Sequence, residues 1–343
     1  MRRPFSGWLG LTALALATLL RHGYALPAMA AGVEVRTFGG LCDASATVSL
    51  DFGFFAVADD EDNLLRVYHA QAGAMPVQSL DLTGFLRVNA REPEADIEGA
   101  ARIGQKIFWI TSHGRNPDGK ERTSRQRFFA TGISGTNGTV SLAPFGRPYD
   151  RLLQDLCSDP RLRRFSLAEA ATKAPKARGA LNIEGLAATA EGRLWIGFRN
   201  PIPEGKALMV PLLNPEGVVA GAAAKLGDPV LVPLGGKGIR SLSEWRGGFL
   251  IVAGAYDGGG PSQLYWWDGG TRIPALLKQP PYGRLNPEAL AEIPGVGEND
   301  LLIVSDDGNV MIGKRPCKKL KDPGQKRFRA ALVPEHALGA PSK

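Results

Sequence analysis

One short motif recurs at five places along this 343-residue chain, and about ten residues after each copy comes a short apolar segment. In the two clearest copies, Glu98 precedes Trp109 by eleven residues and Glu184 precedes Trp195 by eleven residues. Repeats of this kind indicate similar structural units packed side by side. The five motifs are Leu41–Ala44, Asp96–Ala100, Asn182–Leu186, Gly238–Leu242 and Asn286–Leu290.

The repeated units are built from short strands and tight turns. Successive motifs lie between 48 and 86 residues apart, and hairpin patterns follow the first and last copies, as in Ala56–Tyr68 and Ile303–Ile312. The 43 glycines and 25 prolines are too many for the interiors of a helical bundle. Repeats of about 40–50 residues are typical of radial propellers. We therefore predict an all-β fold, a β-propeller of five or six blades; a pair of β-sandwiches would not explain five copies.

The propeller is expected to occupy residues 31–343 as a single domain. A stretch rich in Leu, Arg, Asp and Ala predicts a helical insertion at about residues 145–175. The segment Val33–Phe38 could pair with Phe328–Val333 and close the ring, or it could belong to a sixth blade.

The first thirty residues have the pattern of a secretory signal peptide. Arg2 and Arg3 precede an uncharged apolar run, and small residues precede a cleavage point after Ala30. Arg21 and His22 are unusual in such a segment and leave an uncleaved anchor open. No later segment is long and apolar enough to span a membrane, so we expect a periplasmic or secreted protein.

The charge of the chain limits the kinds of partner that we expect, and its cysteine content bears on disulfide formation. The formal net charge is +7, and basic residues gather in a C-terminal segment at about 314–343. This segment could meet an anionic partner, but a solvated surface is the preferred interpretation, and no aromatic-basic motif indicates nucleic acid. Cys42, Cys157 and Cys317 allow one disulfide in an oxidising compartment. A closed ring would bring Cys42 and Cys317 into one neighbourhood, although the sequence does not settle the pairing.

In a propeller, equivalent positions of the innermost strands converge on the central axis. A small residue follows each converging position, as expected where backbones crowd. Four carboxylates close together raise one another's pKa. An arginine could bridge them, a cation such as Ca²⁺ could bind among them, or one could stay protonated for acid-base work. Alternatively, the acids simply tie blade to blade. The converging residues are Asp43, Glu98, Glu184, Arg240 and Glu288.

A second set of polar residues, which we call the second tier, is expected where the apolar strand after each motif ends. There His113 lies in a polar loop and is expected to be exposed, as a candidate acid, base or ligand. Arg199 is the stronger candidate for holding an anionic group. Trp109 and Trp195 are interpreted as blade packing. The tier consists of Asp59, His113, Arg199, Tyr256 and Asp306.

Common catalytic motifs are absent from the sequence. It contains no Gly-x-Ser-x-Gly, no His-Glu-x-x-His, no Cys-x-x-Cys and no phosphate-binding glycine loop followed by Lys and Ser or Thr.

The motifs "DIEGAA", "NIEGLA" and "IVSDDGN", together with the exported start, resemble bacterial domain-of-unknown-function family 3616 over Cys42 to Val333. More distantly they are similar to the secreted phytase-like and esterase-like propellers. That resemblance implies Ca²⁺ near Asp43, Glu98, Glu184 and Glu288, with phosphate esters handled at the channel mouth near Arg199 and His113. This sequence departs from that pattern by having Arg240 at one of the converging positions, where its side chain could occupy the space of the cation.

Two functions remain open. The first is an exported hydrolase of phosphate or carboxylic esters, with Glu98, Glu184 and His113 as catalytic residues and Arg199, Arg240 and Tyr256 holding the substrate. The second is a non-catalytic scaffold that binds a small anionic molecule or a partner in the cell envelope.

Overall fold

The computed structural model describes residues 33–71, 74–136, 138–279, 285–293 and 300–339. By its internal contacts the chain divides after Ala31, and every described residue belongs to the unit Gly32–Lys343. The predicted signal peptide, residues 1–30, lies outside the described residues.

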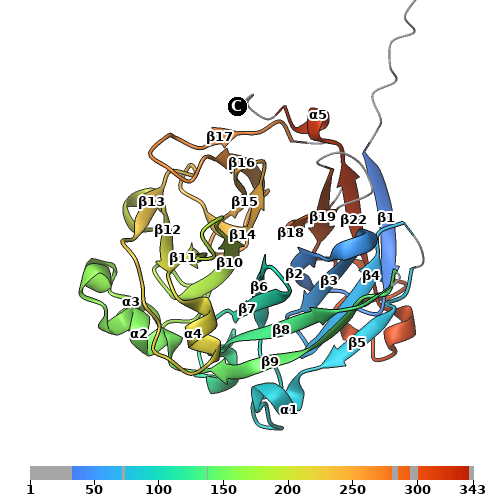
Figure 1. The fold of residues 1–343 in the computed structure, drawn as a ribbon, viewed down its shortest axis with the longest axis horizontal. Coiled ribbons are helices and arrows are strands. Elements are labelled where there is room, and N and C mark those ends of the chain that lie inside the picture. Colours follow the sequence, from blue (N-terminus) through green and yellow to red (C-terminus); the bar gives the residue numbers. More distant parts are fainter. Residues whose placement is uncertain (1–32, 72–73, 137, 280–284, 294–299, 340–343) are drawn as a thin grey trace, which may run out of the picture. The chain divides into compact units, whose positions relative to one another are not determined.

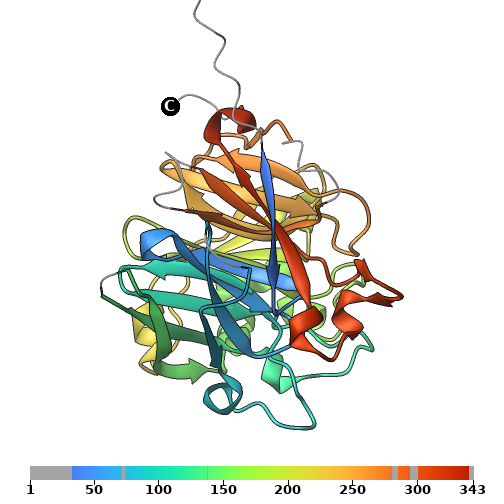
Figure 2. The same ribbon diagram turned by 90° about the vertical axis from the view of Figure 1, so that its right-hand side faces the viewer.

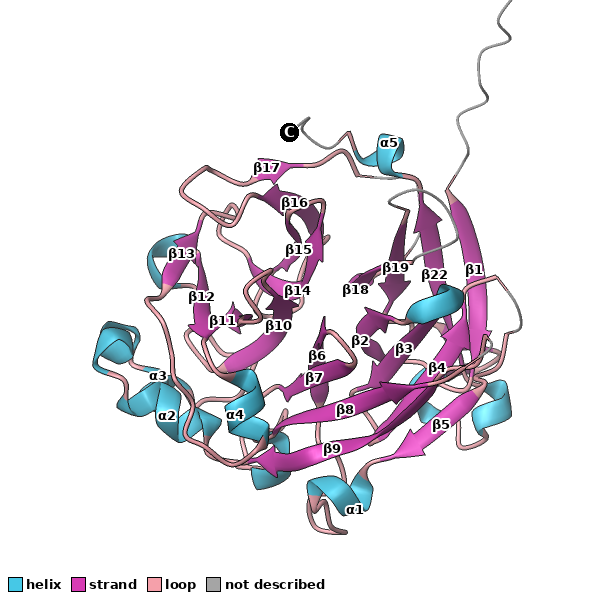
Figure 3. Cartoon of the chain, in the orientation of Figure 1, coloured by secondary structure: helices cyan, strands magenta, loops and turns pink. Residues whose placement is uncertain are grey.

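This unit is a five-bladed β-propeller, in which four-stranded antiparallel sheets surround a central axis (Figures 1 and 3). The innermost strands β2, β6, β10, β14 and β18 contact one another in succession and close a ring. The predicted all-β propeller is therefore confirmed, with five blades.

In blades 1 to 4 the strands follow one another in chain order from the axis outward, whereas blade 5 combines strands from both ends of the chain. Blade 1 contains β2 (Ala44–Ser49), β3 (Phe54–Asp59), β4 (Leu64–His69) and β5 (Gln78–Asp81). Blade 2 contains β6 (Ile97–Ile103), β7 (Lys106–Thr111), β8 (Phe128–Ser134) and β9 (Ser141–Tyr149). Blade 3 contains β10 (Asn182–Ala188), β11 (Leu194–Asn200), β12 (Ala207–Leu212) and β13 (Val230–Val232). Blade 4 contains β14 (Gly238–Trp245), β15 (Gly248–Gly254), β16 (Gln263–Trp267) and β17 (Ala275–Leu276). Blade 5 contains β18 (Pro287–Glu292), β19 (Leu301–Ser305), β22 (Arg327–Val333) and β1 (Glu34–Gly39).

The first and last strands of the propeller close the ring together. β1 pairs antiparallel with β22, from Glu34 opposite Leu332 to Gly39 opposite Arg327 (Figure 2). Phe38 is buried between blades 5 and 1, where its ring stacks on Phe328 with centroids 5.4 Å apart. The predicted pairing is confirmed, and β1 completes the fifth blade rather than a sixth. The disulfide Cys42–Cys317 fastens the same junction.

Each innermost strand carries a β-bulge near its start. One residue has no partner on the neighbouring strand, and a bulge of this kind redirects the side chain and twists the strand. The repeat places this residue at the motif's glutamate in blades 2, 3 and 5. In blade 1 it is Ser45, so Asp43 lies two residues earlier than the sequence alignment put it. The five bulged residues are Ser45, Glu98, Glu184, Arg240 and Glu288.

The glycine after the bulge allows neighbouring inner strands to approach closely. A Cβ on Gly99 would lie 3.0 Å from the Cβ of Leu186 in blade 3. A Cβ on Gly185 would lie 2.7 Å from a methyl carbon of Ile239 in blade 4. The expected crowding around the axis is thus observed at these two positions.

The core lies between the blades and contains the tryptophans of the repeat. Trp109 is fully buried, stacks on Phe129 within blade 2, and belongs to a hydrophobic cluster that also contains residues of blade 1. Trp195 is half-buried and meets Trp267 of blade 4 edge-on, with centroids 5.8 Å apart. Both tryptophans therefore pack blades together, as predicted.

The predicted insertion forms α2 (Leu152–Ser158), a 3-10 turn and α3 (Leu167–Ala170) between blades 2 and 3. Residues 145–149, expected to start the insertion, instead end strand β9. The described part of the basic segment includes the short strand β21 (Arg315–Pro316), paired with β20 (Met311–Ile312), and all of β22. The remaining helices are α1 (Thr83–Leu86), α4 (Pro215–Val219) and α5 (Glu335–Leu338). Across the described ranges, every helix is too short or too polar to cross a membrane.

Candidate functional site

The repeat gathers seven carboxylates at the end of the axis where the innermost strands begin. They fall into three overlapping groups, and within each group one oxygen per residue lies within 4.8 Å of the others. Asp60 is shared by two groups, and so is Glu98, which makes the set continuous. We call this set the axial acid cluster: Asp43, Asp59, Asp60, Asp96, Glu98, Glu184 and Glu288.

The bulge explains which side chains meet. Besides the five bulged residues, the residues two positions earlier form a second layer. The ends of the second strands supply a third layer, which holds Asp60, Arg199 and Asp306. The second layer consists of Asp43, Asp96, Asn182, Gly238 and Asn286.

Two arginines neutralise one side of the cluster. Arg199 donates from Nη1 to Oε1 of Glu184 at 2.6 Å, and its Nε donates to the carbonyl of Ala255 at 3.1 Å. Arg240 forms an ion pair with Glu288, and its Nε lies 3.9 Å from Oε2 of Glu184. Arg240 therefore links the acids of blades 3 and 5 from its position in blade 4. Both guanidinium groups are buried and engaged with the cluster.

Glu98 lies among these residues without an arginine of its own. It is 8% exposed, and no ion pair connects it to any described residue. Burial, and then the charge of Glu184, raise the pKa of Glu98 well above its usual range. The raised pKa favours the protonated form of the carboxyl group, which can donate its proton.

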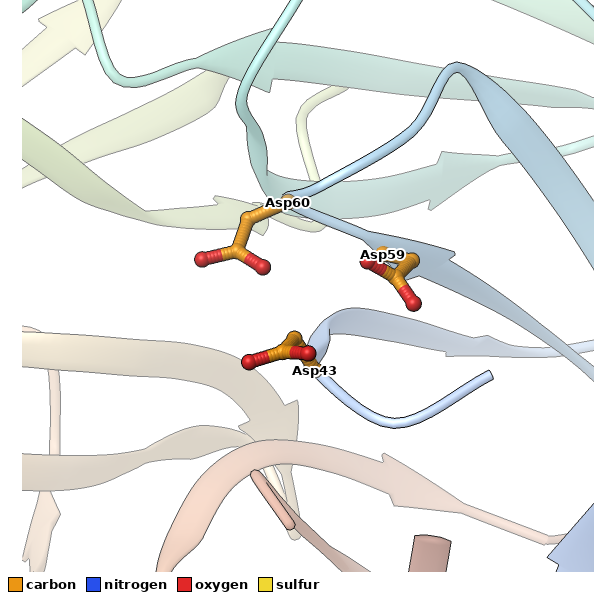
Figure 4. A group of neighbouring side chains, drawn as sticks. All are labelled: Asp43, Asp59 and Asp60. Atoms are coloured by element: carbon orange, nitrogen blue, oxygen red, sulfur yellow. The ribbon is translucent and has the colours of Figure 1, made fainter. Parts of the chain in front are cut away.

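The other end of the cluster is formed by three aspartates from blade 1 (Figure 4). Asp43 precedes β2, and Asp59 and Asp60 come where β3 ends. Burial, followed by the charges of Asp59 and Asp306, raises the pKa of Asp43 to about 8. Burial, followed by the charge of Asp62, raises the pKa of Asp59 to about 6. Burial, and then Asp59, raise the pKa of Asp60 well above normal.

Asp96 connects the two ends of the cluster and has its own counter-ion. Its Oδ2 accepts from Nη1 of Arg125 at 2.8 Å. Burial outweighs this pairing and raises the pKa of Asp96. Arg125 also pairs with Glu94, so its charge is shared between two acids.

Several oxygens at the axis have no hydrogen-bond partner among the described residues. They include Oδ1 of Asp60, Oε2 of Glu184 and Oε2 of Glu288, all shielded from solvent. Oδ1 of Asn182 is also without a partner, although its amide donates to Glu184 at 2.8 Å. Carboxylate and amide oxygens are the ligands that Ca²⁺ prefers. The acidic groups could therefore bind a metal ion.

The four residues predicted to hold a metal are thus distributed unequally. Glu98, Glu184 and Glu288 lie in one group, whereas Asp43 lies in the group with Asp59 and Asp60. Sequence reasoning missed Asp60, Asp96 and Asn182 as members of the site. The aligned motifs "DIEG" and "NIEG" already show a polar residue two positions before each glutamate, and this was the available signal.

His113 is not exposed, contrary to expectation, and it does not join the acids. It is 2% exposed, and its Nδ1 lies 2.8 Å from the carbonyl of Thr111, so this nitrogen carries the proton and donates. Burial lowers the pKa of His113 to about 4. The ring lines a small cavity of about 190 Å³ together with Leu153 and Thr172 of the insertion, and no acid of the cluster lines it.

The other predicted second-tier residues separate in the same way. Arg199 and Asp306 lie in the third layer, and Asn286 donates to Oδ2 of Asp306 at 3.2 Å. Tyr256 lies farther along its loop and lines a larger cavity beside the insertion. At the opposite end of the inner strands, a cavity of about 410 Å³ contains Arg102 and Glu292 but none of the axial acids.

The chain is similar to several solved structures at low sequence identity. The solved structures it resembles include glutaminyl cyclase of Myxococcus xanthus (14% identity, 88% of this chain and 96% of that one, TM-score 0.45). They also include virginiamycin B lyase of Staphylococcus aureus (9%, 88% and 100%, 0.42) and PQQ-bound aldose sugar dehydrogenase of Streptomyces coelicolor (14%, 88% and 98%, 0.40). Likeness at this level carries no activity over to this chain. A search of curated proteins finds no match.

The family comparison bears directly on the repeated motifs. The model of the family described as "Protein of unknown function (DUF3616)" matches residues 143–307, which include three of the five motifs. The resemblance inferred from the motifs is therefore confirmed over these residues.

Proposed function

We propose that this protein is an exported propeller that binds Ca²⁺ in the axial acid cluster and hydrolyses phosphate or carboxylic esters at the adjoining channel mouth. The observation that carries the proposal is the charge balance of the cluster. Among the described residues, seven buried or half-buried carboxylates meet only three arginines within ion-pair distance: Arg125, Arg199 and Arg240.

An excess of buried carboxylates can be relieved by protons or by a cation. The candidate ligand atoms around Asp60 are all oxygens, and Oδ1 of Asp60 accepts no hydrogen bond from the part of the chain that the structure describes. Around Glu184 and Glu288 the arginines already supply positive charge. A cation therefore fits best toward Asp43, Asp59 and Asp60, where no arginine forms an ion pair with these acids among the described residues. A bound Ca²⁺ would supply Lewis-acid polarisation of an ester oxygen.

The residues of the chain itself suggest a division of roles. Glu98 is suited to be a general acid because burial and the charge of Glu184 raise the pKa of its carboxyl group, and because no arginine among the described residues forms an ion pair with it. Glu184 accepts hydrogen bonds from Asn182 and Arg199, and its charge contributes to the raised pKa of Glu98. Arg199 and Arg240 would hold substrate only by giving up contacts with these acids. His113 faces the insertion and takes no part in this proposal.

Export is supported by the disulfide between Cys42 and Cys317. Disulfides persist mainly in oxidising compartments such as the periplasm and the extracellular space. Together with the signal-like first thirty residues, this supports a periplasmic or secreted protein.

The first test combines metal analysis with turnover. Protein purified without added metal is analysed for calcium, then tested on phosphate and acyl esters before and after chelation. The key variant is Glu98→Gln, since glutamine resembles the protonated acid and should preserve folding while removing the donated proton. We expect at least a hundredfold loss of turnover. Glu292→Gln, in the same blade as Glu288 but at the opposite mouth, is the matched control and should keep full activity.

Two results would contradict this proposal. One is the absence of turnover on any ester, and the other is turnover that survives both chelation and Glu98→Gln. Glu184→Gln is less decisive, because it weakens the ion pairs of Arg199 and Arg240 and should lower stability as well as activity.

One observation favours the second candidate function, a non-catalytic scaffold that binds a ligand or partner in the cell envelope. Arg240 in blade 4 joins Glu184 of blade 3 to Glu288 of blade 5, so part of the cluster ties blades together. If calcium is absent and no ester is hydrolysed, this function takes precedence.

A further inference from the structure

One cavity lies away from the axis, beside the helical insertion and blades 3 and 4. Its volume is about 560 Å³, within the range of small-molecule sites. One wall is the insertion from Arg164 to Arg178, and the other is the loop after β11, from Asn200 to Gly205. Tyr256 of blade 4 completes the lining.

The walls of this cavity are predominantly cationic. Arg164, Lys173 and Arg178 line it, and Glu169 is the single acid among the lining residues. Lys173 donates a hydrogen bond from Nζ to Oε1 of Glu169 at 2.8 Å. Within the described residues, Arg164 and Arg178 form no ion pair with a carboxylate. The lining therefore carries a formal charge of about +2, which matches a dianion.

The rest of the lining is apolar or aromatic. Phe165 is buried, and the guanidinium of Arg164 lies 4.7 Å from the centroid of its ring. Pro201, Ile202 and Pro203 face the same space. A ligand that fills this cavity thus needs an apolar body as well as its charge.

Hydrogen bonds from side chains to backbone carbonyls fix the walls of the cavity. The side chain of Asn200 donates to the carbonyls of Pro175 and Ala177 at 3.1 and 2.7 Å, which fixes the insertion against blade 3. Arg199 donates to the carbonyl of Ala255, next to Tyr256, at 3.1 Å. A preformed site of this kind loses little free energy to ordering when a ligand binds.

We propose that this cavity binds a phosphate monoester with an apolar organic group, its phosphate meeting Arg164 and Arg178 and its organic group meeting Phe165 and Pro201–Pro203. Arginine is suited to phosphate because its planar fork donates two parallel hydrogen bonds. The site is separate from the axial acid cluster, so this proposal stands whether or not the cluster hydrolyses esters.

The test is calorimetric titration of the purified full chain with phenylphosphonate, a dianion that cannot be hydrolysed as an ester. We expect it to bind, and to bind more tightly than inorganic phosphate, which lacks the apolar group, and benzoate, which carries one charge. Binding should weaken as salt concentration rises. Equal affinity for benzoate or for inorganic phosphate would overturn the assignment to an organic dianion.

Variants place the ligand in the molecule. Arg178→Gln and Arg164→Gln should each weaken phenylphosphonate binding by about tenfold. Arg272→Gln, which removes an exposed arginine outside the cavity, should leave binding unchanged. Glu98→Gln should also leave it unchanged, which separates this site from the axial cluster. Binding that is lost in Glu98→Gln but kept in Arg178→Gln, or no binding to the unaltered protein, would overturn the proposal.

Discussion

Gly308 lies against the carboxylate of Asp43, and a Cβ at position 308 would overlap that carboxylate. The two residues are far apart in the sequence and meet where blades 1 and 5 adjoin. Asp43 precedes the first inner strand, and Gly308 follows β19 of the fifth blade. The backbones of Asp43 and Asp306 form an isolated antiparallel β-bridge at this junction. The closing junction of the propeller and the edge of the axial acid cluster are therefore one structure.

Gly308→Ala should displace the Asp43 carboxylate and destabilise the protein by about 1–3 kcal/mol, since an added methyl group has no free space. It should also reduce any stabilisation by calcium. Gly132→Ala is the matched control, because a Cβ there meets no atom within 4 Å. Thermal unfolding of both variants, with calcium and with chelator, measures the difference. Equal melting temperatures would show that the junction adjusts without cost.

The metal-free protein should lose stability as pH rises from about 5 to 8. The pKa of Asp43 is raised to about 8 and that of Asp306 to about 6, in both cases by burial first. Across this range the unfolded chain has released protons that the folded protein still holds, so unfolding is favoured as pH increases. Chemical unfolding at several pH values in chelator tests this. Asp43→Asn should flatten the dependence, and an unchanged slope would contradict the raised pKa of Asp43.

His113 should act in the opposite direction and at lower pH. Its pKa is lowered to about 4 by burial, so the unfolded chain binds a proton between about 6.5 and 4 that the folded protein does not. Stability contributed by neutral His113 is therefore lost as pH falls. His113→Asn should weaken the destabilisation by acid, because asparagine does not titrate in this range. Asparagine is chosen because it tolerates the positive φ of 54° at this position. It should leave ester turnover intact; loss of turnover with normal folding would restore His113 as a catalytic candidate.

Arg240→Met should be strongly destabilising, by about 3–5 kcal/mol, because it leaves Glu184 and Glu288 buried with less positive charge. Added calcium should recover part of this loss by taking the place of the guanidinium. Arg246→Met in the same blade removes a half-exposed pair with Glu335 and should cost at most about 1 kcal/mol. Denaturant unfolding with and without calcium checks both. A loss no greater than that of the control would rule out the tie between blades 3, 4 and 5.

Removal of the disulfide by Cys42→Ala with Cys317→Ala should cost about 2–5 kcal/mol, since the bond joins residues 275 positions apart. Cys157→Ala, which removes the free cysteine, should cost much less. Unfolding of the unaltered protein in reductant should reproduce the double variant. If reduction has no effect, the strand pairing of β1 and β22 alone secures the junction.

The repeat predicted the architecture because each blade uses the same local chemistry. The glutamates Glu98 and Glu184 stand at the same bulge in two blades, and the glycine after each is required by the close approach of the next strand. The pairing of β1 with β22 also followed from the need to close a ring.

Details that depend on the bulge and on long loops could not be predicted. The first copy has Ser45 instead of an acid at the bulge, so alignment by charge selected Asp43, two residues too early. His113 looked exposed because its neighbours are polar, but the insertion covers it from a distant part of the sequence. The pairing of Arg240 with two acids depends on side-chain reach across blades, which spacing along the chain does not encode.

The pairing of β1 with β22 also sets the order in which the molecule can be completed. Blades 1 to 4 each consist of one continuous stretch, so each can form as soon as its own residues have left the ribosome. Blade 5 joins Glu34–Gly39 to Arg327–Val333, so the earliest strand must wait for almost the whole chain to be made before it has its neighbour. Closure of the ring is then the last step of folding, and it is the step that brings Asp43 and Asp306 together.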